Sequence, residues 1–440
     1  MIKKYDQSSI MSVAVLFFLC IFSYSNSLTH GFLLDDHLVL LNQVGSGGNS
    51  WVDVLTKGMN GFYRPLGFLF LELLYAFFGK NPTGYNLVNL MLYFFICVLF
   101  LFIVDLLYAH SQSCLRTPPA RDRVSPIAFI AACLYCVHPI NNMIVNYKTA
   151  SMLAVFIICS QLSFMLFLIY SDKGSKFCYW GSLLFYLCAL FSHEVSSILP
   201  AYILFFICFL KNIKLKKIIY LLSPYLACFV FFIFVRSHIN HLRPIDTLFH
   251  LHISLGLYVA TVSDLIIWYL SKLFLPYNLL FIWDVPIIAE HILSRILVLL
   301  FVIISSMVLF LILIRSKKRL ELFSLTLFLI GFIPAGIAAF TYSSLLKTAI
   351  IEPHWFYFCS IGFFMLIARV FLFIGENFNK TARNLIFGLV IVILVTATRE
   401  SNVVWKDEAT YCTYWIKLNP LNYTPREAML LRPVLVTKSP

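Results

Sequence analysis

Long apolar stretches separated by short polar segments occupy most of the chain. Such stretches predict transmembrane helices, because a helix needs about twenty apolar residues to cross a bilayer. We expect about eleven spans, at roughly residues 10–28, 85–108, 125–138, 149–170, 177–192, 196–210, 218–235, 291–314, 321–340, 355–375 and 383–398. The expected fold is therefore an all-α integral membrane protein.

Two other apolar stretches do not fit this series. The stretch from Leu66 to Phe78 is short for a span and ends at the turn signal Gly79 to Pro82. Residues 255–275 are long enough, but a crossing there would put the basic cluster at 315–319 outside, against the positive-inside rule. We therefore expect residues 255–275 to form a re-entrant or surface-lying helix.

The basic residues set the orientation of the spans. They gather in short loops, such as those at 116–123, 211–217 and 315–319, which the positive-inside rule places in the cytoplasm. Most other ionisable residues then fall on the opposite face, namely Asp35, Asp36, Arg64, His138, Lys148, His193, Glu194, Arg236, Glu352 and His354. Polar groups gathered at one membrane face predict a site for an extracytoplasmic substrate.

Composition excludes a soluble protein. Hydrophobic residues make up 61% of the 440 and charged residues 12%, whereas soluble domains are about half apolar and a quarter charged. The net charge of +13 lies mostly in the short loops, so we expect membrane lipids as its partners and no nucleic acid. The twelve cysteines are scattered through apolar runs as small hydrophobic residues, and the Cys133-x-x-Cys136 pair lacks a second pair for a zinc site.

Asp35 and Asp36 directly follow the first apolar stretch. A pair of carboxylates is costly inside hydrocarbon, but at the rim of an aqueous cavity it could ionise, accept a proton or hold a cation. The alternative is a polar stop that ends the first helix. The residues themselves leave both interpretations open.

Several motifs together resemble the GT-C superfamily of polytopic glycosyltransferases. They are Phe-x-x-Asp-Asp after the first span, Tyr63-Arg64-Pro65-Leu66, the run from Gly79 to Leu90, His138-Pro139-Ile140, Ser192-His193-Glu194 and Glu352-Pro353-His354-Trp355. The set is most similar to the transmembrane O-mannosyltransferases with tetratricopeptide repeats and to their bacterial relatives. The resemblance implies a GT-C-like domain over residues 1–399, whose first extracytoplasmic loop is 29–84. Residues 400–440 would be an extracytoplasmic tail that resembles the start of a tetratricopeptide-repeat region.

The same resemblance implies the chemistry. A sugar, with mannose as one candidate, would move from a polyprenyl- or dolichyl-phosphate donor to a protein or glycan acceptor on the extracytoplasmic side. Asp35 or Asp36 would be the general base, and either could instead bind a divalent cation such as Mg²⁺ or Mn²⁺; no other cofactor is implied. Arg64, Arg236 and His354 would bind the donor phosphate, and His138, Lys148, His193, Glu194 and Glu352 would support them. The membrane would be a bacterial inner membrane, with the endoplasmic reticulum as the alternative.

Two departures from the family pattern keep other functions open. Asn141-Asn142-Met143 stands where relatives usually carry an acidic residue, and His193 stands where they often carry lysine. A transporter or lipid flippase would instead place polar residues near the bilayer midplane and break helices in matching halves. A polysaccharide polymerase or ligase would not predict two acids directly after the first span. A non-catalytic relative of a glycosyltransferase is the remaining alternative.

Overall fold

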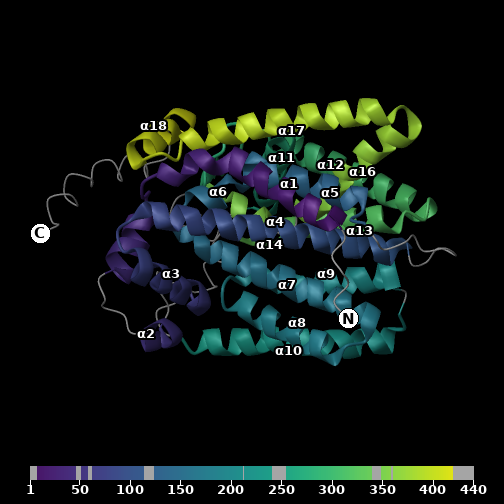
Figure 1. Ribbon diagram of the computed structural model, residues 1–440, viewed down its shortest axis with the longest axis horizontal. Coiled ribbons are helices and arrows are strands. Elements are labelled where there is room, and N and C mark those ends of the chain that lie inside the picture. Colours follow the sequence, from purple (N-terminus) through teal and green to yellow (C-terminus); the bar gives the residue numbers. More distant parts are fainter. Residues whose placement is uncertain are drawn as a thin grey trace, which may run out of the picture.

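The computed structural model describes residues 7–45, 51–57, 62–112, 123–211, 213–239, 254–338, 348–357 and 360–419. Within these ranges ten helices are long and apolar enough to cross a membrane, or eleven if one bent pair counts as a span. The expectation of an all-α polytopic membrane protein is confirmed. Figure 1 shows the long helices lying side by side.

The long helices are α1 (Gln7–Tyr24), α4 (Pro82–Gln112), α5 (Pro126–Val137), α7 (Ser151–Lys173), α8 (Lys176–Leu190), α9 (Leu199–Phe206, continued by η6, Ile207–Lys211), α10 (Leu215–Ser237), α11 (Leu255–Phe274), α12 (Ile292–Arg315), α13 (Arg319–Ile330), α16 (Ser360–Asn377) and α17 (Lys380–Val403). Shorter helices are η1 (Ser25–Thr29), η2 (Asp36–Val44), α2 (Trp51–Thr56), α3 (Pro65–Phe78), η3 (Pro139–Asn141), α6 (Asn142–Asn146), η4 (Lys148–Ala150), η5 (Glu194–Ile198), α14 (Phe332–Ala338), η8 (Pro353–Phe356) and α18 (Glu408–Leu418). Strands β1 (Trp283–Pro286) and β2 (Thr348–Ile351) pair antiparallel.

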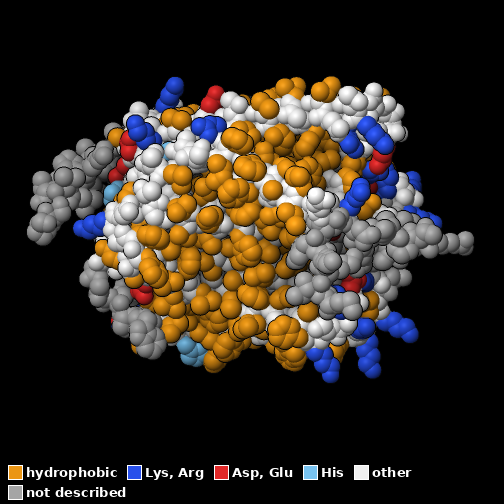
Figure 2. All heavy atoms as spheres, viewed as in Figure 1, with side chains coloured by type: hydrophobic (Ala, Val, Ile, Leu, Met, Phe, Trp, Pro, Cys, Tyr) orange, Lys and Arg blue, Asp and Glu red, His pale blue; other side chains and the backbone are white. Residues whose placement is uncertain are grey.

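The surface matches the environment of a bilayer. Figure 2 shows a broad apolar band over the middle of the bundle, with lysine and arginine side chains towards its two ends. The most peripheral helices are α12 and α17, where only 11% and 6% of the apolar window is buried inside the protein. Apolar side chains that face outward in this way are stable in lipid, where they meet hydrocarbon instead of water.

The break at His138-Pro139 bends the chain by 59° between α5 and the segment from Pro139 to Asn146. Proline has no N–H to donate and excludes the helical conformation at the preceding residue, so α5 ends at Val137. The chain then forms short helices as far as the start of α7. This region, residues 138–150, is buried and packs against the loop that carries Asp35 and Asp36.

Helix α11 is long and apolar enough to cross a membrane, so its expected re-entrant or surface-lying placement stays a prediction. Its first half meets the beginning of α12, where Ser263 Oγ donates to the carbonyl of Arg295 at 2.7 Å. Its second half contacts the end of α5, where His138 Nε2 donates to the carbonyl of Leu273 at 3.1 Å. Both halves therefore lie at the end of the bundle opposite the basic turn between α12 and α13.

Two expected spans differ from the helices that correspond to them. The expected span at 177–192 corresponds to α8, whose fifteen residues rise only about 22 Å, less than a bilayer core. The expected span at 383–398 corresponds to α17, which is longer and continues to Val403. Beyond it, α18 packs onto the bundle through Tyr411 and Trp415, both fully buried. Residues 420–440 of the expected tail lie outside the described residues.

Candidate functional site

Asp36 joins the first loop to the start of α7. Its side chain is fully buried, and its two carboxylate oxygens accept N–H groups from Leu33 at 3.0 Å and from Thr149 at 2.9 Å. Burial raises the pKa of Asp36, while the nearby charge of Lys148 opposes that rise. Because both oxygens already have backbone donors, Asp36 holds two segments together and does not face a solvent-filled space.

Asp35 is the exposed member of the pair. Its backbone N–H donates to the hydroxyl of Tyr147 at 2.9 Å. The preceding residue, Leu34, has a φ of 43°, in the left-handed region that a leucine rarely adopts. Such local strain persists only where surrounding contacts hold it, and it turns the chain so that Asp35 and Asp36 diverge. Of the two acids, Asp35 is thus the one open to a substrate.

Lys148 is fully buried beneath this loop. Its ammonium donates to the carbonyl of Gly31 and, at 3.1 Å, to the carbonyl of Asn146. Lysine with buried backbone acceptors ties segments together through charge-assisted hydrogen bonds. The structure therefore places Lys148 beside the acid pair, as a residue that shapes the loop.

A network of buried asparagines surrounds this loop, and sequence reasoning missed it. Asn146 accepts from His30 Nδ1 at 2.9 Å and donates to Asn402 Oδ1 at 2.8 Å. Asn402 in turn donates to the carbonyl of Ser23 at 2.9 Å. Asn86 and Asn89 of α4 donate to the carbonyls of His30 and Tyr147, at 2.9 and 2.7 Å. The available signal was the presence of paired asparagines inside otherwise apolar stretches.

A second polar cluster forms where α3 begins. Arg64 Nε and Nη2 donate to the two carboxylate oxygens of Glu194, at 2.9 and 3.0 Å. The Arg64 guanidinium also lies 4.3 Å from the centroid of the Phe62 ring. A bidentate pair with an aromatic ring over it fixes the plane of the guanidinium. Glu194, whose side chain is 39% exposed, leaves this pair accessible from one side.

Two histidines extend the cluster. The rings of His193 and His354 are 5.4 Å apart and meet edge to face, and His354 Nδ1 lies 3.0 Å from a carboxylate oxygen of Glu352. Burial, together with the charge of Arg64, holds the pKa of His193 well below its usual range, so this ring is neutral. The Nε2 atoms of both histidines are buried and have no hydrogen-bond partner in the part of the chain that the structure describes.

The remaining predicted residues lie outside these two groups. Both ring nitrogens of His138 make hydrogen bonds to the backbone. Nδ1 accepts the N–H of Ile140 at 3.2 Å, and Nε2 donates to the carbonyl of Leu273 near the end of α11. Arg236 lies near the end of α10, one turn after Phe232, which packs on Phe191 at 5.6 Å. Within the described ranges Arg236 has no ion pair with the cluster. The structure thus gathers two of the three predicted phosphate-binding residues.

Helix α7 relates the two groups. Thr149, two residues before α7 begins, donates its N–H to Asp36, and the ring of Phe156, seven residues after Thr149, lies 4.9 Å from that of His193. Seven residues of helix rise about 10 Å, so the acid pair and the Arg64–Glu194 cluster lie near the same end of the bundle. This is the end where Figure 1 shows α3 and α18.

A divalent cation at the acid pair would have few protein ligands. Both oxygens of the buried Asp36 already accept a backbone N–H, and within the described ranges no group of three His, Cys, Asp or Glu ligands includes Asp35. Mg²⁺ commonly keeps several waters and binds through one or two carboxylates plus substrate phosphates. The residues present therefore fit a cation held by Asp35 only together with a substrate.

Comparison with known proteins gives one similarity. The chain is 31% identical to the Protein O-mannosyl-transferase Tmtc3 of Drosophila melanogaster over 142 residues, an alignment that covers 28% of this chain and 15% of that relative. No family model matches the chain. No solved structure matches it. A stretch of the chain is thus related to a glycosyltransferase, and it corresponds to a small part of that protein's length.

Proposed function

We propose that this chain is a membrane glycosyltransferase that takes a sugar from a polyprenyl- or dolichyl-phosphate donor. The observation that carries the proposal is the cluster of Arg64, Glu194, His193 and His354. It combines an arginine that binds the partly exposed Glu194 in a bidentate pair with two buried ring nitrogens that have no hydrogen-bond partner among the described residues. A phosphate group matches both features, because its oxygens accept hydrogen bonds and its charge complements a guanidinium.

The cluster suggests how the donor would be held. Arg64 is paired with Glu194 in the absence of substrate, so a donor phosphate would replace the carboxylate as its partner. His354, whose charge the Glu352 carboxylate supports when the ring is protonated, would supply a further donor. Cationic donors around the leaving phosphate stabilise the negative charge that develops as the sugar departs.

Asp35 is our candidate for the general base. It is exposed, it lies at the same end of the bundle as the cluster, and its backbone is fixed by Tyr147. In the proposed reaction the acceptor hydroxyl loses its proton to Asp35, and its oxygen forms a bond to the anomeric carbon. The bond from that carbon to the phosphate oxygen breaks, and the lipid phosphate leaves. Asp36 keeps the loop in place and does not take the proton.

The similarity to Tmtc3 supports an O-mannosyltransferase-like reaction, with mannose as the first sugar to test and a protein or glycan hydroxyl as acceptor. The distribution of basic loops supports a site on the extracytoplasmic face. That face would be the periplasmic side of a bacterial inner membrane or the lumenal side of the endoplasmic reticulum.

The experiment is transfer by the purified chain in proteoliposomes, with radiolabelled polyprenyl-phosphate mannose as donor and a serine- and threonine-rich peptide as acceptor. We expect labelled peptide from the wild type, none from Asp35→Asn, and normal amounts from Asp53→Asn, which removes an acid elsewhere in the same loop. Translocation of the intact donor, or growth of a polymer without peptide labelling, would support a flippase or a polymerase and overturn the proposal.

A further inference from the structure

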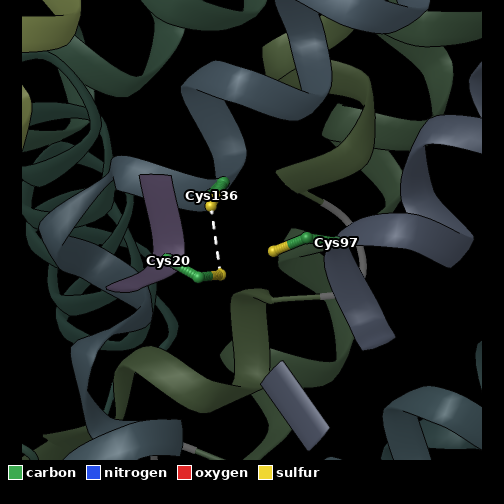
Figure 3. Close-up of side chains that lie close together, drawn as sticks. All are labelled: Cys20, Cys97 and Cys136. Atoms are coloured by element: carbon green, nitrogen blue, oxygen red, sulfur yellow. Dashed lines mark hydrogen bonds between the residues drawn. The ribbon is translucent and has the colours of Figure 1, made fainter. Parts of the chain in front are cut away.

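Three cysteines from three helices meet inside the bundle. Cys20 of α1, Cys97 of α4 and Cys136 of α5 point their sulfur atoms towards one another, as Figure 3 shows. The Sγ atoms of Cys20 and Cys136 are 3.3 Å apart, and all three sulfurs lie within 4.8 Å of one another. All three side chains are at most 1% exposed. The sequence, in which these cysteines are scattered through apolar runs, does not show that the three thiols meet.

The cluster is not the C-x-x-C pair of the sequence. Cys133 is buried on the same helix as Cys136 but does not belong to the group of three. The hydroxyl of Tyr93 donates to the carbonyls of Tyr135 and Cys136, at 2.9 and 3.0 Å, and so holds the end of α5 against α4. The backbone that carries two of the three thiols is therefore fixed before any ligand binds.

The spacing of the sulfurs fits three-coordinate binding of a metal ion. A cation about 2.3 Å from each of three thiolate sulfurs, with all four atoms in one plane, places those sulfurs about 4 Å apart. The observed separations, from 3.3 Å to below 4.8 Å, bracket this value. Rotations of the cysteine side chains would be enough to close the site.

Coordination number then selects among the soft metals. Zinc in structural sites takes four ligands, and no fourth His, Cys, Asp or Glu joins the three sulfurs in the described part of the chain. Thiolates also bind Cu(I), a soft ion for which three sulfur ligands are sufficient.

We propose that Cys20, Cys97 and Cys136 form a buried Cu(I)-binding site that joins α1 to α4 and α5. The three sulfurs bind as thiolates and supply all the ligands, and the thiol protons released on binding go to water. This site is separate from the sugar-transfer machinery proposed above, and neither proposal depends on the other.

The test is copper binding by the purified protein in detergent, with Cu(I) supplied from a weak chelator under a reductant. We expect one copper per chain, measured by elemental analysis, and an X-ray absorption spectrum with three sulfur neighbours and no oxygen or nitrogen. Cys20→Ala, Cys97→Ala and Cys136→Ala should each lose the bound copper. Cys133→Ala, which removes a buried thiol from the same helix, should keep it.

Binding can be separated from folding. Each variant is first checked for a single symmetric peak in size-exclusion chromatography, and Cys→Ser replacements, which preserve the side-chain volume more closely, are used for any variant that fails. Copper retained by all three single variants, or no copper on the wild type, overturns the proposal. So does a stable Cys20–Cys136 disulfide that forms in the reduced, copper-free protein on brief exposure to air and prevents copper binding.

Discussion

The Arg64–Glu194 pair gives the sharpest test of donor binding, because the two partners should act in opposite directions. Arg64→Ala removes the proposed phosphate contact, whereas Glu194→Gln removes the carboxylate with which the phosphate must compete. The first change should weaken binding of the lipid donor, and the second should strengthen it. A purely structural ion pair predicts the same loss from either change.

The expected size follows from the exposure of the pair. The Arg64 side chain is 14% exposed and that of Glu194 is 39% exposed, so solvent screens part of the interaction. A partly exposed bidentate contact with a charged group is worth about 1 to 2 kcal/mol. That range corresponds to a rise of about 5- to 30-fold in the donor KM for Arg64→Ala. Glu194→Gln should lower the donor KM by up to about fivefold.

The assay is initial-rate peptide labelling in proteoliposomes over a range of donor concentrations, with acceptor saturating. Arg236→Ala is the matched control, since it removes the same charge at the same end of the bundle without an ion pair to the cluster in the described ranges. It should change the donor KM less than Arg64→Ala. A rise in KM for Glu194→Gln that equals the rise for Arg64→Ala would refute the competition between carboxylate and phosphate.

Three other predictions concern the acid pair and the network around it. Asp35→Asn should abolish peptide labelling with little change in Tm. Asp36→Asn turns an amide NH₂ towards a backbone N–H, so it should lower the free energy of unfolding by about 1 to 3 kcal/mol and lower Tm. The reverse pattern would exchange the roles of the two residues. Burial, aided by the charge of Lys148, lowers the pKa of His30 from 6.5 to about 4, so stability should fall by at most about 3 kcal/mol as pH drops across that interval. His30→Gln should flatten this part of the Tm profile, and an unchanged profile would contradict the assignment. Asn402→Leu leaves the carbonyl of Ser23 without its donor and should lower Tm without changing the donor KM.

Much of the fold could be predicted because the bilayer imposes a length and a composition on each span. The apolar stretches at 85–108 and 149–170 reappear as α4 and α7, and the break at His138-Pro139 ends α5 as proline requires. The charge of a distant loop predicts a re-entrant or surface-lying helix at 255–275, whereas length and hydropathy alone would allow α11 to span, so this placement stays a prediction.

The site could be predicted only in part, because side-chain partners depend on contacts between distant segments. Nothing local shows that Asp36 accepts an N–H from Thr149, or that Arg64 pairs with Glu194 across 130 residues. The cysteine cluster could not be predicted for the same reason, because the rotation of three helices about their axes decides which thiols meet. The kinds of residue that form the site could be read from the sequence, but their hydrogen-bond partners could not.

The difference between Asp35 and Asp36 follows from this packing. Adjacent residues in an extended or helical segment point in different directions, and the left-handed conformation of Leu34 sets which of them turns inward. Asp36 turns inward, where burial disfavours its charge and two backbone N–H groups bind its oxygens. That buried anchor in turn keeps Asp35 at the surface, next to the start of α7. A base that must meet a large acceptor needs such exposure, and a rigid neighbour supplies its position.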